Sequence, residues 1–193
     1  MVSEKEIKSE LPRTLAEFMI WESNDGYKYE WNDGELIKFS GMNKKQVKIY
    51  DILNKLFIKK GYWESGTFVA GYDVQLCGTP PAGLQMRRSD IAYLTKAQTN
   101  EADRGEDPIP EFVVEIISEN DNINKVLAKI GEYYKAGVKI VWLIFPEEKE
   151  VHIYSSRREV KICIENDICS ASLILPDFEI GVDKLLDYQL LES

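Results

Sequence analysis

The chain has 193 residues, of which 44% are hydrophobic and 30% are charged, and its formal net charge is −9 at pH 7. This length favours a single domain that spans residues 1–193. The hydrophobic content excludes a disordered protein, although we expect the polar segment at residues 1–12 to be flexible. The acidic balance argues against tight, indiscriminate binding to nucleic acid, because a surface that binds phosphate is generally basic, so any such contact must be local.

The N-terminal segment mixes both signs of charge and lacks the apolar stretch of a signal peptide. No run of about 18 apolar residues follows, so we expect a cytoplasmic protein with no membrane segment. Thr14 and Glu17 have the spacing of a capping box and predict a short helix through about Glu22. Two alternating runs, 27–31 and 35–39, flank an Asn-Asp-Gly turn and predict a β-hairpin.

Residues 43–60 have the periodicity of an amphipathic helix that ends at Gly61. The side opposite the apolar stripe carries four lysines within an arc of roughly 60°. Two interpretations remain open, because such a stripe is either a solvated helix face or a surface that contacts the phosphates of DNA. The candidate DNA-binding residues are Lys44, Lys48, Lys55 and Lys59.

The middle of the chain alternates short apolar runs with loops and one helix. We predict a strand over 62–76 and a loop over 77–86, which is rich in glycine and proline. Strands over 89–94 and 111–117 follow, separated by an acidic and mobile segment. A helix capped by Asp121 or Asn122 and ended by Gly137 then leads into a strand over 139–145. The order strand, helix, strand over 111–145 predicts a parallel pair joined by a crossover helix.

Beyond Pro146 the pattern predicts a β meander over 151–155, 160–164 and 172–175, followed by a helix over 182–188. His152 alternates with apolar neighbours and is expected to point to solvent, so a role as a metal ligand is not favoured. The cysteines are odd in number and form no CxxC motif, which predicts reduced, structural residues rather than a disulfide framework or a zinc site. They are Cys77, Cys163 and Cys169.

Two acidic residues lie in runs that are otherwise apolar. Glu115 interrupts the strand over 111–117, and Asp90 occupies the strand over 89–94. A buried, unpaired carboxylate costs several kcal/mol or stays protonated, so each residue needs a partner. A hard divalent ion such as Mg²⁺ or Mn²⁺ held between them would satisfy both. The alternatives are a strand-end cap for Asp90 and an ion pair of Glu115 with Arg87 or Arg88.

Lys129 lies on the helix that follows Glu115, about 40° outside the edge of the apolar arc. Its long side chain can reach round the helix toward the strand ends. An ammonium group there could stabilise charge on a phosphate or position an attacking water, as in metal-assisted hydrolysis of a phosphodiester. The alternative is an ordinary surface lysine.

An apolar strand with Asp90, a second with Glu115, a helix and a further strand resemble the core of the PD-(D/E)XK nuclease superfamily. Several segments in the same order resemble the Uma family of putative restriction endonucleases, over about residues 13–188. These segments are Tyr29–Glu35, Ser89-Asp90, Glu111–Ser118, Lys129 with Tyr133, and Gly137–Pro146.

The resemblance implies a restriction-endonuclease-like α/β fold, in which helices flank a mixed central β-sheet, with an additional N-terminal hairpin and C-terminal β meander. It implies that Asp90 and Glu115 bind the metal, with the carbonyl of Ile116 as a further ligand. Lys129 takes the role of the catalytic lysine, moved from the usual position two places after the glutamate, and Glu30 completes the site directly or through water. An exposed polar position on the hairpin is the alternative for Glu30.

The chain departs from the family pattern at three positions. Ser89 stands where the family has proline before the aspartate, Gln46 where it often has histidine, and Lys125 where it often has aspartate. None of these changes removes a proposed ligand. We therefore expect a Mg²⁺- or Mn²⁺-dependent DNA endonuclease, and the family suggests a homodimer. The alternative is a catalytically inactive relative that binds nucleic acid or protein.

Overall fold

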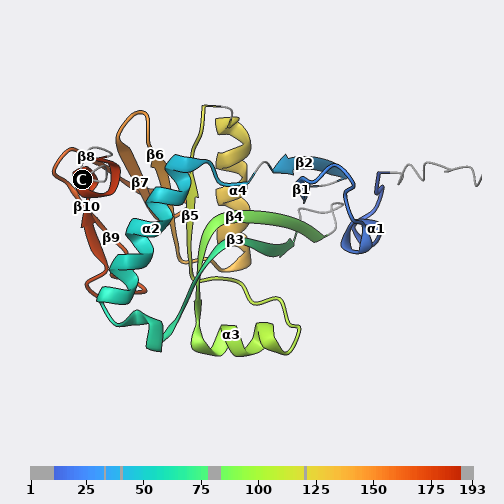
Figure 1. Cartoon of the computed structure of the whole chain (residues 1–193), viewed down its shortest axis with the longest axis horizontal. Coiled ribbons are helices and arrows are strands. Elements are labelled where there is room, and N and C mark those ends of the chain that lie inside the picture. The colour runs from blue at the N-terminus through green and yellow to red at the C-terminus, as the bar shows by residue number, and fades with distance from the viewer. Residues whose placement is uncertain (1–10, 33, 40, 78–83, 120, 188–193) are drawn as a thin grey trace, which may run out of the picture.

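The computed structural model describes residues 11–32, 34–39, 41–77, 84–119 and 121–187. Within these residues the chain forms an eight-stranded mixed sheet with helices on both faces, and a two-stranded sheet lies beside it (Figure 1). The order in the large sheet is β2-β1-β4-β5-β6-β7-β8, and β3 pairs with β4. The predicted α/β class, with helices flanking a mixed central sheet, is confirmed.

The large sheet contains β1 (Lys28–Asn32), β2 (Glu35–Phe39), β3 (Gly66–Cys77), β4 (Leu84–Thr95), β5 (Phe112–Ile116), β6 (Ile140–Phe145), β7 (Glu150–Ser156) and β8 (Glu159–Ile164). The small sheet pairs β9 (Ile168–Ser170) with β10 (Glu179–Gly181). The helices are α1 (Leu15–Ile20), α2 (Lys44–Lys59), the 3-10 helix η1 (Tyr62–Glu64), α3 (Lys96–Asp103), α4 (Ile123–Ala136) and α5 (Val182–Leu186).

β5 lies in the middle of the sheet and is buried along its whole length, as its apolar sequence predicts. Phe112, Val114 and Ile116 pack into a core that includes residues of α2 and α5. Val113 points to the other face, where it packs with residues of α4. β5 and β6 are parallel and are joined through α4, so the predicted crossover unit is confirmed.

The two long helices begin and end where their sequences predict. Asn43 and Gln46 form a reciprocal capping box at the start of α2. At the start of α4, the side chain of Asn122 accepts hydrogen bonds from the N–H groups of Asn124 and Lys125. α4 ends at Gly137, whose φ of 110° is a left-handed conformation that favours glycine.

The predicted N-terminal hairpin is confirmed, because β1 and β2 pair antiparallel. In its turn Gly34 has a φ of 85°, whereas residue 33 lies outside the described part of the chain. α1 is capped by Thr14 as predicted but ends at Ile20 rather than near Glu22. Of the lead predicted to be flexible, residues 1–10 lie outside the description, and Pro12 is buried.

Three predictions for the middle of the chain were wrong in their limits. β3 begins at Gly66 rather than at 62, because Tyr62–Glu64 form the turn η1. β4 is longer than 89–94, since antiparallel pairing with β3 supports it from Leu84 to Thr95 despite its polar residues. The acidic segment predicted to be mobile contains α3, which starts with a capping box of Thr95 and Gln98. Residues 78–83 of the predicted loop lie outside the description.

The C-terminal meander is confirmed only for β7 and β8. The predicted strand over 172–175 is wrong, since these residues form turns in which Leu175 is buried, and β9 pairs with β10 instead. His152 does not point freely to solvent, because its ring lies 4.6 Å from that of Phe145 and its side chain is only 20% exposed.

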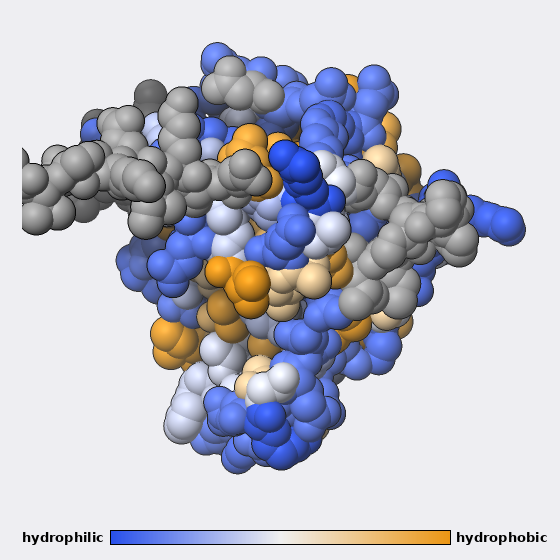
Figure 2. Space-filling view, turned by 90° about the vertical axis from the view of Figure 1, so that its right-hand side faces the viewer, coloured by the Kyte–Doolittle hydropathy of each residue, from blue (hydrophilic) through white to orange (hydrophobic). Residues whose placement is uncertain are grey.

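Cys163 and Cys169 are buried and free, which agrees with structural cysteines; the side chain of residue 77 lies outside the description. Among the described residues, no helix is long and apolar enough to cross a membrane. Figure 2 views the molecule from the right of Figure 1 and shows a mostly hydrophilic face with scattered apolar patches.

Candidate active site

The two carboxylates singled out in the sequence lie side by side on one face of the sheet. β4 and β5 pair antiparallel with Ile91 opposite Val114, and one further step in this register sets Asp90 beside Glu115. Ile91 and Val114 point to the α2 side, so the alternation of a strand turns both acidic side chains toward α4. The predicted juxtaposition of Asp90 and Glu115 is therefore present.

Both carboxylate oxygens of Glu115 have partners on α4. Oε2 lies 3.1 Å from Lys129 Nζ, and Oε1 accepts a hydrogen bond of 2.7 Å from the hydroxyl of Tyr133. Lys129 and Tyr133 are four residues apart, which places them on the same side of the helix. Burial raises the pKa of Glu115 even though these two partners favour its ionised form.

Asp90 has a backbone partner instead. Its Oδ2 accepts a hydrogen bond of 2.7 Å from the N–H of Ile116, at the end of β5, and the residue is only 6% exposed. Burial, followed by the negative charge of Glu115, raises the pKa of Asp90 to about 7. Asp90 thus acts as a strand-end cap, one of the alternatives that the sequence left open, while remaining electrostatically strained by its neighbour.

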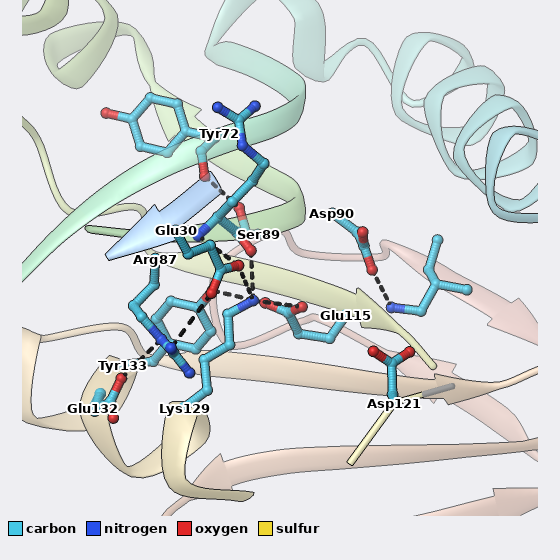
Figure 3. Close-up of polar contacts among 12 residues, drawn as sticks. Glu30, Tyr72, Arg87, Ser89, Asp90, Glu115, Asp121, Lys129, Glu132 and Tyr133 are labelled. Carbon is cyan, nitrogen blue, oxygen red and sulfur yellow. Dashed lines mark hydrogen bonds and ion pairs between the residues drawn. The ribbon is translucent and has the colours of Figure 1, made fainter. Parts of the chain in front are cut away.

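Lys129 is buried, and its ammonium group lies at the strand ends as the sequence predicts. It contacts Glu115, Glu30 Oε1 at 3.2 Å and the carbonyl of Arg88 (Figure 3). Burial alone would lower the pKa of Lys129, but attraction to Glu115, Glu30 and Asp90 outweighs it and raises the pKa. Lys129 is therefore a cation at neutral pH, and the interpretation as a surface lysine is wrong.

Glu30 is buried, which overturns its alternative as an exposed hairpin position. Its Oε1 accepts from the N–H of Arg88 at 3.0 Å as well as from Lys129, and its Oε2 lies 3.4 Å from Arg87. Arg87 also lies 3.1 Å from Glu132 of α4. Glu30 therefore holds cations in place. Among the described ion pairs, Glu115 pairs with Lys129, Arg87 with Glu30 and Glu132, and Arg88 with Asp73, rather than Glu115 with either arginine.

Sequence reasoning missed three members of this cluster. The sequence indicates Arg87 only as a possible partner of Glu115 and does not point to Glu132, although Glu132 lies one turn after Lys129 on α4. Gln46 was noted only as a departure from the family pattern. In the structure its side-chain amide donates a hydrogen bond of 2.8 Å to the carbonyl of Ile116.

A cavity of about 610 Å³ opens over these groups. It is bounded by β1 and β2, the start of α2, the middle of β4, the end of β5 and the start of α4. At its outer part Lys125 of α4 pairs with Glu35 of β2 at 2.7 Å. Its polar lining consists of Glu30, Lys38, Asn43, Gln46, Arg87, Arg88, Asp90, Glu115, Ser118, Asp121, Asn122, Lys125 and Lys129.

The lysine stripe of α2 is not part of this lining. Lys44, Lys55 and Lys59 are exposed, Lys48 is half-buried, and Lys55 forms an ion pair with Asp51. Only the first turn of α2, through Gln46 and its cap Asn43, reaches the cavity. A role of the four lysines in DNA binding stays a prediction.

The donor set suits a hard divalent cation. Among the described residues, no group of three or more His, Cys, Asp and Glu side chains is placed to hold a metal. Two carboxylates and one backbone carbonyl meet in the cavity beside the end of β5, namely those of Asp90 on β4 and of Glu115 and Ile116 on β5. A small, oxygen-only set of this kind fits Mg²⁺ or Mn²⁺, since Mg²⁺ keeps several waters and binds through one or two carboxylates.

Comparisons with known proteins agree with this architecture. A family model described as "Uma2: Putative restriction endonuclease" matches residues 15–183. The chain also resembles a crystal structure of a putative nuclease belonging to DUF820 from Anabaena variabilis ATCC 29413, with a TM-score of 0.74 and 19% sequence identity. That likeness covers 91% of this chain and 98% of the other, and it establishes a shared fold. No curated protein matches the chain.

Proposed function

The chain belongs to the Uma2 family of putative restriction endonucleases, and from this membership we propose that it is a Mg²⁺- or Mn²⁺-dependent endonuclease that hydrolyses phosphodiester bonds in DNA. The proposal is carried by the charge of the buried cluster. Four carboxylates, those of Glu30, Asp90, Glu115 and Glu132, face the two cations Arg87 and Lys129. When all are ionised, two negative charges are left, which one divalent cation would neutralise.

In this proposal Asp90, Glu115 and the carbonyl of Ile116 hold the metal ion, which would polarise the phosphate and activate a water when bound. Lys129 faces the same cavity and supplies a fixed positive charge for the negative charge that develops on the phosphate. Its raised pKa makes it an electrostatic group rather than a base. Glu30 and the carbonyl of Arg88 position the ammonium group.

Cleavage of plasmid and of branched DNA in the presence of Mn²⁺ tests the proposal. We expect wild-type protein to cut and Asp90→Ala to lose the activity, while Asp51→Asn, on the exposed side of α2, keeps it. Equal cleavage by wild type and Asp90→Ala would refute the assignment of the site. The family resemblance also leads us to propose a homodimer, which size-exclusion chromatography with light scattering would test.

A second candidate is a nuclease-fold protein that binds nucleic acid or protein without cleaving it. The observation in its favour is that both oxygens of Glu115 already have partners in Lys129 and Tyr133. Calorimetric titration distinguishes the two, because a folded protein that takes up no Mn²⁺ supports the binding module, whereas Mn²⁺ uptake that Asp90→Ala abolishes supports the nuclease.

A further inference from the structure

The last peptide of β5 is held by side chains where a neighbouring strand would otherwise hold it. The pairing of β4 with β5 covers Phe112–Val114. Beyond it, the N–H of Ile116 donates to Asp90, and the carbonyl of Ile116 accepts from Gln46 Nε2 at 2.8 Å. The same carbonyl is the proposed third ligand of the metal. Gln46 thus touches a ligand atom from a helix 70 residues away in sequence.

The amide of Gln46 is fixed in direction by its own helix. Its Oε1 accepts a hydrogen bond of 2.8 Å from the backbone N–H of Asn43, and the backbone N–H of Gln46 donates to Oδ1 of Asn43 at 3.0 Å. Since Oε1 is engaged in this capping box, the Nε2 group is the end that remains for Ile116. The residue is buried, so water does not readily replace either contact.

We propose that Gln46 is a positioning residue for the metal site, and this inference rests on the proposed function. A carbonyl oxygen has two lone pairs, so the amide of Gln46 can occupy one while the other is directed at a cation between Asp90 and Glu115. Because Gln46 holds the carbonyl of Ile116 in one orientation, less conformational freedom of the peptide is lost when the ion binds. Residues that orient metal ligands typically change metal affinity about 10- to 100-fold when they are removed.

The test measures the affinity of the apo protein for Mn²⁺ alone, by calorimetry and by electron paramagnetic resonance of the free ion. Three variants separate the two functions of Gln46. Gln46→Ala loses the contact with Ile116 and one half of the cap, Asn43→Ala loses the other half of the cap and keeps the contact, and Gln46→His keeps an N–H donor for the carbonyl of Ile116. Thermal unfolding without metal reports the effect on the helix cap separately.

We expect Gln46→Ala to weaken Mn²⁺ binding about 10-fold, and Asn43→Ala and Gln46→His to stay within about threefold of wild type. Both Gln46→Ala and Asn43→Ala should lower the melting temperature, and Gln46→Ala should lower it more, because it also leaves the carbonyl of Ile116 without its partner. Unchanged affinity in Gln46→Ala, or equal weakening in Asn43→Ala or in Gln46→His, would overturn the positioning role alone. A folded wild type that takes up no Mn²⁺ would overturn the proposed function together with this inference.

Discussion

Replacing Asp90 by asparagine should stabilise the metal-free protein at high pH. The folded state raises the pKa of Asp90 from 3.8 to about 7, because the side chain is buried beside Glu115. The folded protein therefore binds a proton more tightly than the unfolded chain, and the stability of the wild type falls as the pH rises from about 4 through 7. Asparagine carries no charge, and its amide oxygen can still accept the N–H of Ile116.

The size of the effect follows from the shift. Each pKa unit corresponds to about 1.4 kcal/mol, so the roughly two units between pH 5 and the folded pKa give about 3 kcal/mol as an upper limit. In urea titrations with EDTA, the free energy of unfolding of Asp90→Asn should gain that much relative to wild type between pH 5 and pH 8.

Asp51→Asn is the matched control, since Asp51 lies outside the cluster on α2. Its difference from wild type should not change between the two pH values. A constant difference between Asp90→Asn and wild type would refute the reasoning, because it would mean that Asp90 titrates normally. If the proposed metal site binds Mn²⁺, its addition should reverse the order at pH 8, since the wild type would then be stabilised by the bound ion.

Three further predictions concern single contacts. Lys129→Met should destabilise the metal-free protein by about 3–5 kcal/mol in urea titrations at pH 8, because Glu30 and Glu115 lose a buried cation; a loss below about 1 kcal/mol would contradict this. Tyr133→Phe should cost about 1–3 kcal/mol in the same assay at pH 8, because the buried Oε1 of Glu115 loses its hydrogen-bond partner, and an unchanged midpoint would exclude that bond. Changing all four stripe lysines, Lys44, Lys48, Lys55 and Lys59, to glutamine should lower the salt dependence of DNA binding by about one unit per phosphate contact; an unchanged slope would show that DNA binds elsewhere.

The sequence predicts the fold best for segments that are buried along their whole length. The apolar run of β5 and the well-capped α4 predict the crossover unit, and the same logic makes Glu115 conspicuous. The apolar residues at 172–175 predict a strand by the same reasoning, but there the burial of Leu175 comes from a turn that packs under the core. A short apolar run of this kind is compatible with a buried strand and with a buried turn, and only its neighbours in the fold decide between them. The start of α3 could have been predicted from Thr95 and Gln98, which have the spacing of a capping box. The acidic composition of the segment suggested a mobile loop instead.

The parts of the site that were missed are contacts between distant segments. Arg87 meets Glu30 of β1 and Glu132 of α4, and no local spacing encodes such a triad. In the sequence, Gln46 can be identified only as the residue three places after the N-cap Asn43 in a capping box. Its contact with Ile116 depends on where the pairing of β4 with β5 ends, which the sequence does not show. A periodic pattern shows which face of a strand or helix a residue occupies. It does not show which residue of a distant segment that side chain contacts.

Because the residues of the cluster come from distant parts of the chain, their order in the sequence determines when, during synthesis, the candidate site can form. Glu30, Asp90, Glu115 and Lys129 come from four elements, and the parallel partner of β5 is β6, which follows all of them in the chain. A ribosome-bound fragment that stops before Ile140 lacks the strand that fixes one edge of β5. The candidate site should then form late, after most of the polypeptide has been made.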